Sequence, residues 1–335
     1  MDGINLNSVT EWLAEYIEDL SPPLEFSLIA GGHSNLTYKF SDSTGFNYVL
    51  RRPPLGHVLE SAHDMVREHR IISALGGSSV PVPETVVVCE DKAINDAPFY
   101  VMKFVSGDVL HDKDGAKSTN LEDRFKIGRD VVSVLARLHS INPDDVGLGD
   151  LGRRSGYIER QLKRWTAQWD ASKTEEVPAM EEVSILLHEK MPEQIGATIV
   201  HGDYRLGNMI VEDGSIRAVL DWELCTLGDP LADLGYLLNN WVLPGEDELA
   251  NVPTAVGGFP DRDALCLEYE RATGRDLSRI NYYRAFSHWR LAAINQGVYK
   301  RYLVGAMGDR DDGIDLEAQL AGVKQKAITA LDLMG

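Results

Sequence analysis

Two short polar segments limit what this chain can fold into more than any other feature. The first is His201-Gly-Asp-Tyr-Arg-Leu-Gly-Asn208, with an acid and an amide five positions apart. The second is Leu220-Asp-Trp-Glu223, which ends the apolar run that starts at Ala218. An Asp and an Asn in a short loop between strands can converge on one point, and an Asp at a neighbouring strand end can join them. We therefore predict that the chain folds so that these two loops meet.

The oxygen atoms of these loops suit phosphoryl transfer. Hard divalent cations such as Mg²⁺ prefer carboxylate and amide oxygens, so Asn208 and Asp221 are candidate metal ligands. Asp203 is then free to accept a proton from a hydroxyl group. Phosphoryl transfer requires a bound metal ion, a group that orients the nucleophile, and neutralisation of the charge on the phosphates.

The rest of the chain divides into two patterns. Strand-like runs at 26–30, 36–41, 47–51, 85–90 and 99–104 surround a predicted helix over about 63–75. Another helix over about 8–19 precedes them, with Ser8-Val-Thr-Glu11 as a capping box. After residue 107 the pattern is mainly helical, with Thr119-Asn-Leu-Glu122 as a second capping box and loops at 111–118 and 243–260. A chain of 335 residues is also too long for one ordinary core, so we expect two lobes.

Taken together, these motifs resemble the aminoglycoside phosphotransferase and choline kinase-like family. The family's catalytic loop reads His-Gly-Asp-x-x-x-x-Asn, which the segment 201–208 matches, and its metal-binding Asp follows an apolar strand, as Asp221 does. The segment Gly228-Asp-Pro-Leu-Ala-Asp-Leu234 is similar to the family's downstream segment. The segment Leu50-Arg-Arg-Pro-Pro54 resembles one in relatives that are associated with acyl-CoA dehydrogenases. The resemblance covers most of the chain.

The resemblance implies an α+β, protein-kinase-like bilobal fold. Its N-lobe would be an antiparallel sheet with one main helix, and its C-lobe would be mostly helical. We expect residues 1–105 to form the nucleotide-binding lobe and residues 106–335 to form the catalytic and substrate-binding lobe.

The resemblance also implies roles for the loop residues. Asp203 would be the catalytic base, and Asn208 and Asp221 would be the Mg²⁺ ligands. Arg205 stands where protein kinases often carry a Lys that touches the transferred phosphate, and a cation there offsets charge on that group. Glu223 either assists the metal or the substrate or is a solvated loop carboxylate.

Nucleotide-binding elements should then occur upstream in a fixed order. Ser34 and Asn35 belong to a glycine-containing turn that would cover phosphates. Arg51 replaces the usual Lys of the third strand and can still neutralise phosphate charge. We expect an ion pair between Arg51 and Glu68 of the next helix, and we interpret Arg52 as a solvated residue.

The linker between the lobes should contact adenine mainly through its backbone. Met102 would flank the adenine, and the Lys103 carbonyl and Val105 amide would make the two hydrogen bonds. Many relatives carry Glu where this chain has Lys103, and a backbone contact tolerates that change.

The implied activity is transfer of the γ-phosphate of ATP, with Mg²⁺, to a hydroxyl of a small molecule. The acceptor would be an aminoglycoside-like aminosugar or a hydroxyacyl-CoA or related hydroxy acid. The alternative is a weakly active pseudokinase or nucleotide-binding regulator, suggested by Arg51 and the incomplete glycine loop. A protein kinase is disfavoured, because Trp-Glu rather than Phe-Gly follows Asp221.

Charge and composition narrow the possible partners. The formal net charge of −19 disfavours nucleic acid and anionic membranes as partners. The apolar runs are too short to span a bilayer, and the first residues show no signal-peptide pattern. The three cysteines lack disulfide or metal-ligand spacing. We expect a cytoplasmic monomer or homodimer.

Overall fold

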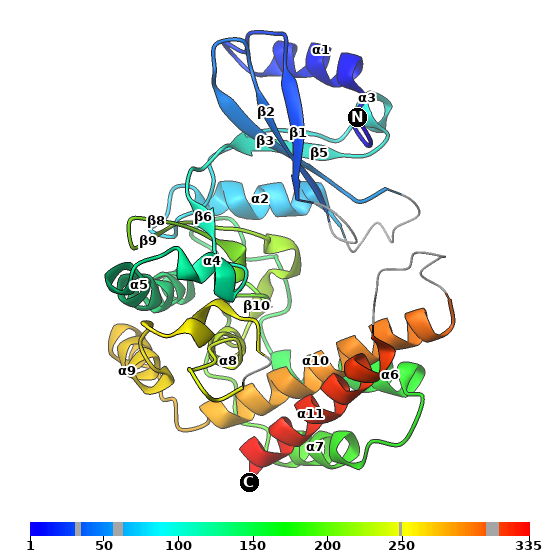
Figure 1. The fold of residues 1–335 in the computed structure, drawn as a ribbon, viewed down its shortest axis with the longest axis vertical. Coiled ribbons are helices and arrows are strands. Elements are labelled where there is room, and N and C mark those ends of the chain that lie inside the picture. Colours follow the sequence, from blue (N-terminus) through cyan, green and yellow to red (C-terminus); the bar gives the residue numbers. More distant parts are fainter. Residues whose placement is uncertain (31–34, 56–62, 248–249, 306–314) are drawn as a thin grey trace.

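The computed structural model describes residues 1–30, 35–55, 63–247, 250–305 and 315–335. An N-terminal sheet with its helices stands above a larger, mostly helical body (Figure 1). The α+β class, the antiparallel N-terminal sheet and the helical remainder are therefore confirmed.

The N-terminal sheet is antiparallel throughout, with the strand order β1-β2-β3-β5-β4. Its strands are β1 (Glu25–Ala30), β2 (Leu36–Ser41), β3 (Asn47–Arg52), β4 (Thr85–Cys89) and β5 (Phe99–Lys103). Each lies within one residue of its predicted bounds.

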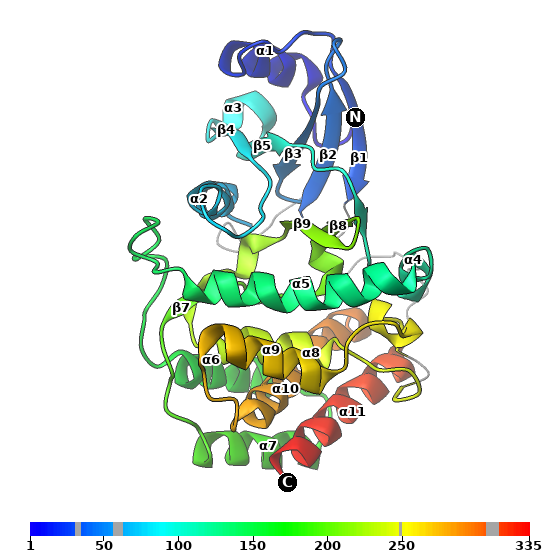
Figure 2. The same ribbon diagram turned by 90° about the vertical axis from the view of Figure 1, so that its left-hand side faces the viewer.

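Helices cover both faces of this sheet. The helices α1 (Leu6–Tyr16) and α3 (Lys92–Asn95) lie at one face, and α2 (Met65–Leu75) lies at the other, toward the C-lobe (Figure 2). Leu50 and Val101 pack in one buried cluster with Leu13 of α1, whereas Val49 packs in another with Ile72 of α2. Successive side chains of a strand point to opposite faces, so the side chain of residue 51 follows Val49 toward the cleft.

Three local predictions were wrong. Helix α1 begins at Leu6, before Ser8, and its N-cap residue Asn5 makes no side-chain cap hydrogen bond. Helix α5 (Leu121–Ser140) is capped by Asn120, not Thr119; the Asn120 side chain accepts a hydrogen bond from the Asp123 amide. The expected loop 111–118 contains the short helix α4 (Lys113–Lys117), which Asp112 caps.

The C-lobe is built on long helices around α5. The others are α6 (Tyr157–Ser172), α7 (Pro178–Glu189), α8 (Leu231–Asn239), α9 (Arg262–Thr273), α10 (Ile280–Leu303) and α11 (Leu316–Met334). Helix α10 contacts α11, α8 and α6, so it holds the lower part of the lobe together. No helix in the described ranges is both long and apolar enough to cross a bilayer.

Two small sheets lie close to α5, and Figure 2 shows β8 and β9 of one of them between α5 and the N-terminal sheet. One has the order β6 (Asp108–Val109), β8 (Met209–Glu212) and β9 (Ser215–Val219), and the other pairs β7 (Thr198–Val200) with β10 (Thr226–Gly228). The segment 201–208 connects β7 to β8 and ends in the 3-10 turn Leu206–Asn208. Residues 220–223 connect β9 to β10 through the 3-10 turn Trp222–Leu224. Both polar segments therefore leave strand ends that face the upper lobe.

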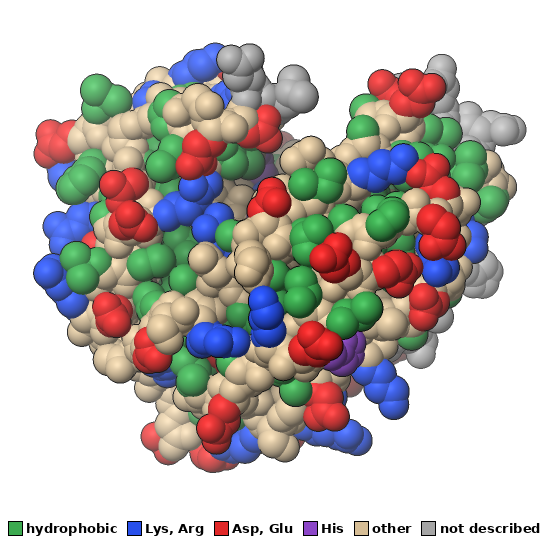
Figure 3. All heavy atoms as spheres, turned by 90° about the horizontal axis from the view of Figure 1, so that it is seen from below, with side chains coloured by type: hydrophobic (Ala, Val, Ile, Leu, Met, Phe, Trp, Pro, Cys, Tyr) green, Lys and Arg blue, Asp and Glu red, His purple; other side chains and the backbone are tan. Residues whose placement is uncertain are grey.

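The surface carries charges of both signs. Acidic and basic side chains are interspersed on the face that Figure 3 shows, which is the underside of the view in Figure 1. The net charge of −19 is therefore not gathered into a single acidic field on this face.

Candidate active site

Backbone hydrogen bonds to a buried carboxylate set the shape of the 201–208 loop. The amides of His201 and Gly202 donate to the two oxygens of Asp233, at 2.6 and 2.9 Å. The His201 ring contacts the carbonyl oxygen of Leu220 through Nε2 at 2.9 Å. His201 is completely buried, and it braces the loop rather than reaching the cleft, as predicted.

Asp233 is itself held from behind. His139 of α5 lies with Nε2 3.4 Å from Asp233 Oδ2, and its other ring nitrogen contacts the Tyr269 hydroxyl at 2.7 Å. Burial alone would raise the pKa of the Asp233 carboxyl, but the contact with His139 and the loop amides lower it below its ordinary value. Burial lowers the pKa of His139. The 201–208 loop is thus fixed to α8 and α5 by a buried polar network.

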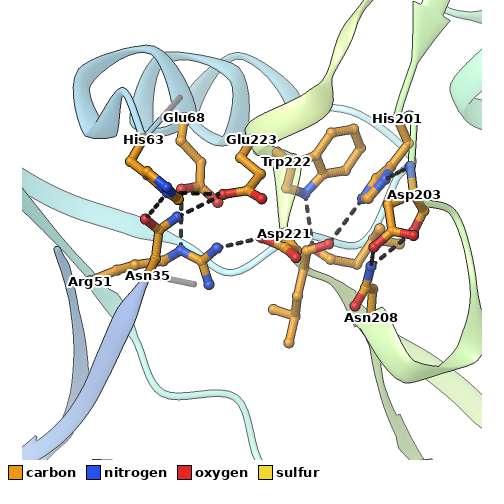
Figure 4. Close-up of polar contacts among 12 residues, drawn as sticks. Asn35, Arg51, His63, Glu68, His201, Asp203, Asn208, Asp221, Trp222 and Glu223 are labelled. Atoms are coloured by element: carbon orange, nitrogen blue, oxygen red, sulfur yellow. Dashed lines mark hydrogen bonds and ion pairs between the residues drawn. The ribbon is translucent and has the colours of Figure 1, made fainter. Parts of the chain in front are cut away.

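Asp203 is partly exposed and has partners on both carboxylate oxygens. The Asn208 side-chain amide donates to Asp203 Oδ2 at 2.6 Å and to the Asp203 carbonyl oxygen at 2.9 Å (Figure 4). The Tyr236 hydroxyl donates to Oδ1, and Arg205 Nε lies 3.5 Å from the same oxygen. Asn208 thus fixes one edge of the carboxylate, and the other edge faces Tyr236 and Arg205.

Asp221 reaches the same region from the second loop. The Leu220 amide donates to the Asn208 carbonyl oxygen at 2.8 Å, which ties the two loops together. Asp221 has a left-handed backbone (φ 67°, ψ 60°), a conformation that side chains other than Gly, Asn and Asp rarely adopt. The two loops meet, as predicted, with Asn208 and Asp221 on the cleft side.

Arg51 connects the N-lobe to this loop. Its Nε donates to Glu68 Oε2 at 3.2 Å, and its terminal nitrogen donates to Asp221 (Figure 4). Burial would lower the pKa of Arg51, but the carboxylates of Glu68 and Asp221 raise it overall; burial raises the pKa of Glu68. The predicted Arg51–Glu68 ion pair is present, and the contact with Asp221 was not foreseen.

The interpretation of Arg52 as solvated was wrong. Arg52 is 5% exposed, and its guanidinium donates to the carbonyl oxygens of Gly3 and Pro53. It lies on the sheet face opposite Arg51, and the N-terminal segment and α3 cover that face. Its neighbours satisfy it with backbone carbonyls, so it has a structural role.

Glu223 joins a cluster that spans the two lobes. Asn35 at the start of β2 donates to Glu223 Oε2 at 3.0 Å, and its amide oxygen contacts His63 at 2.8 Å (Figure 4). Burial, followed by the nearby charge of Asp221, raises the pKa of Glu223 to about 7. Glu223 is therefore not the solvated loop carboxylate of the second alternative.

A cavity of about 360 Å³ lies between the lobes beside these groups. Its lining includes seven of the residues predicted to bind nucleotide or metal: Asn35, Arg51, Met102, Lys103, Val105, Asn208 and Asp221. Apolar side chains such as Val49 and Ile72 form much of the remaining wall, and this mixture is typical of small-molecule sites. Glu68, Asp203 and Arg205 do not line it, and Ser34 lies outside the described residues.

The oxygen atoms of Asn208 and Asp221 fit a metal ion that is coordinated mainly by the phosphates of a bound nucleotide. No group of three or more His, Cys, Asp or Glu side chains suited to a metal ion occurs in the described residues. Asn208 uses its amide nitrogen for its hydrogen bonds to Asp203, which leaves its amide oxygen for a cation. Mg²⁺ is usually held by one or two carboxylates together with substrate phosphates, so Asn208 and Asp221 are a sufficient protein contribution.

Sequence reasoning missed Tyr236 and did not place Arg290 beside this loop. Tyr236 lies three residues after Asp233 on α8, so helical spacing could have placed it beside the loop that Asp233 holds. Arg290 of α10 donates to the Gly202 carbonyl oxygen at 3.1 Å, and its guanidinium carbon lies 5.4 Å from the Tyr236 ring centre. The position of Arg290 had no local signal, because α10 is far away in sequence.

Known proteins share this sequence pattern. A family model described as the phosphotransferase enzyme family matches residues 25–267. Acyl-CoA dehydrogenase family member 10 from Mus musculus is 38% identical over 84% of this chain, and member 11 from Homo sapiens is 34% identical over 84%. The matched regions make up only 27% and 36% of those two proteins, so the chain corresponds to one part of each.

Solved structures share the fold. A candidate aminoglycoside phosphotransferase from Ralstonia eutropha superposes with a TM-score of 0.82 at 32% identity, covering 98% of this chain and 97% of the other. An aminoglycoside phosphotransferase solved with AMP-PNP and hygromycin B gives a TM-score of 0.63 at 17% identity, covering 97% of this chain and 98% of the other. The second likeness shows the protein-kinase-like fold alone. With the family model spanning most of its length, this chain belongs to the phosphotransferase enzyme family.

Proposed function

We propose that this chain is an ATP-dependent phosphotransferase that transfers the γ-phosphate to a hydroxyl group of a small molecule. The observation that supports this most strongly is that Asn208 and Asp221 line one interlobe cavity with Arg51, while Asn208 also holds the Asp203 carboxylate and Glu68 pairs with Arg51. Family membership supports phosphotransfer, and several neighbours were solved with ATP analogues or ADP.

On the donor side, the cavity would hold ATP. Met102 would flank the adenine, with the Lys103 carbonyl and Val105 amide as its backbone partners, and Asn35 and Arg51 would contact the phosphates. Glu68 keeps the Arg51 guanidinium in place, because its own position on α2 is buried. Mg²⁺ held by Asn208 and Asp221 would supply charge neutralisation at the phosphates.

On the acceptor side, Asp203 would accept the proton of the attacking hydroxyl. The hydroxyl oxygen forms a bond to the γ-phosphorus while the bond from phosphorus to the bridging oxygen of ADP breaks. Asn208 keeps the carboxylate oriented for this transfer, and Arg205 lies close enough to offset charge on the moving phosphoryl group.

Among acceptors, the site favours an anionic hydroxyacyl thioester or hydroxy acid over a cationic aminosugar. Arg205 and Arg290 flank the catalytic loop, and within the described residues Arg290 makes no ion pair with a carboxylate. The relatives named as acyl-CoA dehydrogenase family members point the same way. Neighbours with hygromycin B or streptomycin keep the aminosugar as the second candidate.

A screen of acceptors with ADP release as the readout tests the proposal. It should include hydroxyacyl-CoA thioesters, free hydroxy acids and aminosugars, each with the wild-type chain and the Asp203→Asn variant. Acceptor-stimulated release that depends on Asp203 is expected. If the chain binds ATP but no acceptor stimulates ADP release, in wild type or in the variant, the result would support the nucleotide-binding regulator instead.

A further inference from the structure

The Tyr236 hydroxyl donates into the oxygen of Asp203 that an acceptor hydroxyl would need. The Asn208 amide donates to Asp203 Oδ2, and the Tyr236 hydroxyl of α8 donates to Asp203 Oδ1. Tyr236 is 8% exposed, and burial together with the charge of Asp203 raises the pKa of its phenol. The phenol therefore stays protonated at neutral pH and remains a hydrogen-bond donor.

Orienting Asp203 does not require this contact. The Asn208 side-chain amide already donates to Asp203 Oδ2 at 2.6 Å and to the backbone carbonyl oxygen of Asp203 at 2.9 Å. The loop backbone is fixed separately by Asp233. The phenol adds a donor on the one edge of the carboxylate that Asn208 leaves open.

A buried cation holds the Tyr236 ring in place. The Arg290 guanidinium lies over the ring and is anchored to the Gly202 carbonyl oxygen, one residue before Asp203. Arg290 is 9% exposed, and its Nε atom is buried with no hydrogen-bond partner among the described residues. A buried donor without a partner is costly, so Arg290 is held here by its contacts with the Tyr236 ring and the Gly202 carbonyl oxygen.

We propose that Tyr236 is a placeholder for the acceptor: its hydroxyl occupies Asp203 Oδ1 and keeps water from the base until an acceptor hydroxyl displaces it. This inference rests on the proposed function and deepens it. Without the phenol, a water molecule could donate to Oδ1. Its oxygen would then bond to the γ-phosphorus, its proton would pass to Asp203, and ADP would leave with the bridging oxygen, so ATP would be hydrolysed to ADP and phosphate.

The test is ADP release from Mg-ATP in the absence of any acceptor. The Tyr236→Phe variant keeps the ring and removes only the hydroxyl, and we expect it to release ADP about fivefold faster than wild type, the ratio that one ordinary hydrogen bond represents. Adding Asp203→Asn to this variant should abolish the gain. Tyr282→Phe is the matched control, because Tyr282 is equally buried but donates to the Leu187 carbonyl oxygen, away from the site.

Release by Tyr236→Phe at or below the wild-type rate would overturn the inference, since a phenol that merely positions Asp203 predicts a loss. Tyr236→Met, which is flexible and apolar, gives the same comparison if the Phe variant fails to fold. Thermal denaturation with and without Mg-ATP separates the two proposals. If Mg-ATP stabilises neither wild type nor variants, the proposed function fails and the inference with it; if it stabilises all of them without the gain, only the inference fails.

Discussion

The two walls of the cleft treat their charged groups differently. In the N-lobe wall, Arg51 pairs with the buried Glu68 and also reaches Asp221, so cation and carboxylates neutralise one another. In the C-lobe wall, Arg290 is buried and donates to a backbone carbonyl oxygen, and the free edge of Asp203 faces a neutral phenol and Arg205. The charges of the first wall are therefore paired with one another, whereas Arg290 in the second wall has no carboxylate partner within the described residues. Under the proposed function, the first wall (the donor wall) would bind the nucleotide and the second (the acceptor wall) would bind the acceptor.

The largest expected effect is on the acceptor wall. Asp203→Asn should lower phosphotransfer about 10²- to 10⁴-fold, the usual contribution of a positioned general base, because the amide cannot accept the proton. Affinity for Mg-ATP, measured by calorimetry, should change little, since Asp203 does not line the cavity. Unchanged turnover in this variant would remove Asp203 from the mechanism.

The next largest effect is on the donor wall. Arg51→Met should cost about 3–5 kcal/mol in the free energy of unfolding, because it leaves Glu68 buried without its cation. Denaturant unfolding measures this cost, and the double variant Arg51→Met with Glu68→Met should recover part of it. A matched control is Arg70→Met, which breaks the exposed ion pair with Asp150 and should change stability little. Equal losses of unfolding free energy in the Arg51 and Arg70 variants would contradict the expected difference between a buried and an exposed ion pair.

A smaller effect concerns the network behind the catalytic loop. Asp233→Asn should lower the free energy of unfolding by about 1–3 kcal/mol at neutral pH, since a buried set of hydrogen bonds is weakened. The folded pKa of Asp233 lies below its ordinary value, so its stabilisation is fully present above the unfolded pKa and is lost as pH falls through the folded one.

The free energy of unfolding, measured from pH 7 downward, therefore tests whether Asp233 stabilises the fold through its negative charge. Wild type should lose its advantage over Asp233→Asn as the solution becomes acidic, and the two curves should converge. A constant difference at all pH values would mean that the variant acts through packing rather than through the charge of Asp233.

The smallest effect is expected at the linker. Lys103→Ala should change ATP affinity less than about twofold, because the proposed adenine contact uses the backbone and the side chain pairs with Glu84 at the exposed surface. Calorimetry with ATP measures it. A large loss of affinity would show that the side chain itself contacts the nucleotide.

The sequence predicted the fold and the donor wall better than the acceptor wall. Strand alternation located the sheet, and the Asp–Asn spacing located the loop, because both are short-range patterns. The capping box at Thr119 was misplaced because the neighbouring Asn120 caps the helix as well, whereas the helix near Ser8 begins earlier, at Leu6, without a side-chain cap. The contact of Tyr236 with Asp203 and that of Arg290 with the Gly202 carbonyl oxygen were not found, because only the packing of the C-lobe brings α8 and α10 to the loop.

The left-handed backbone at Asp221 restricts which amino acids can stand at this position before any chemistry is considered. Residues that adopt a positive φ readily are Gly, Asn and Asp, and of these only Asp carries a charge. Variants at position 221 should therefore fall into two groups. Gly and Asn would keep the fold and lose activity, whereas β-branched residues would lose both. At this position the backbone leaves a choice of three residues, and the negative charge reduces that choice to one.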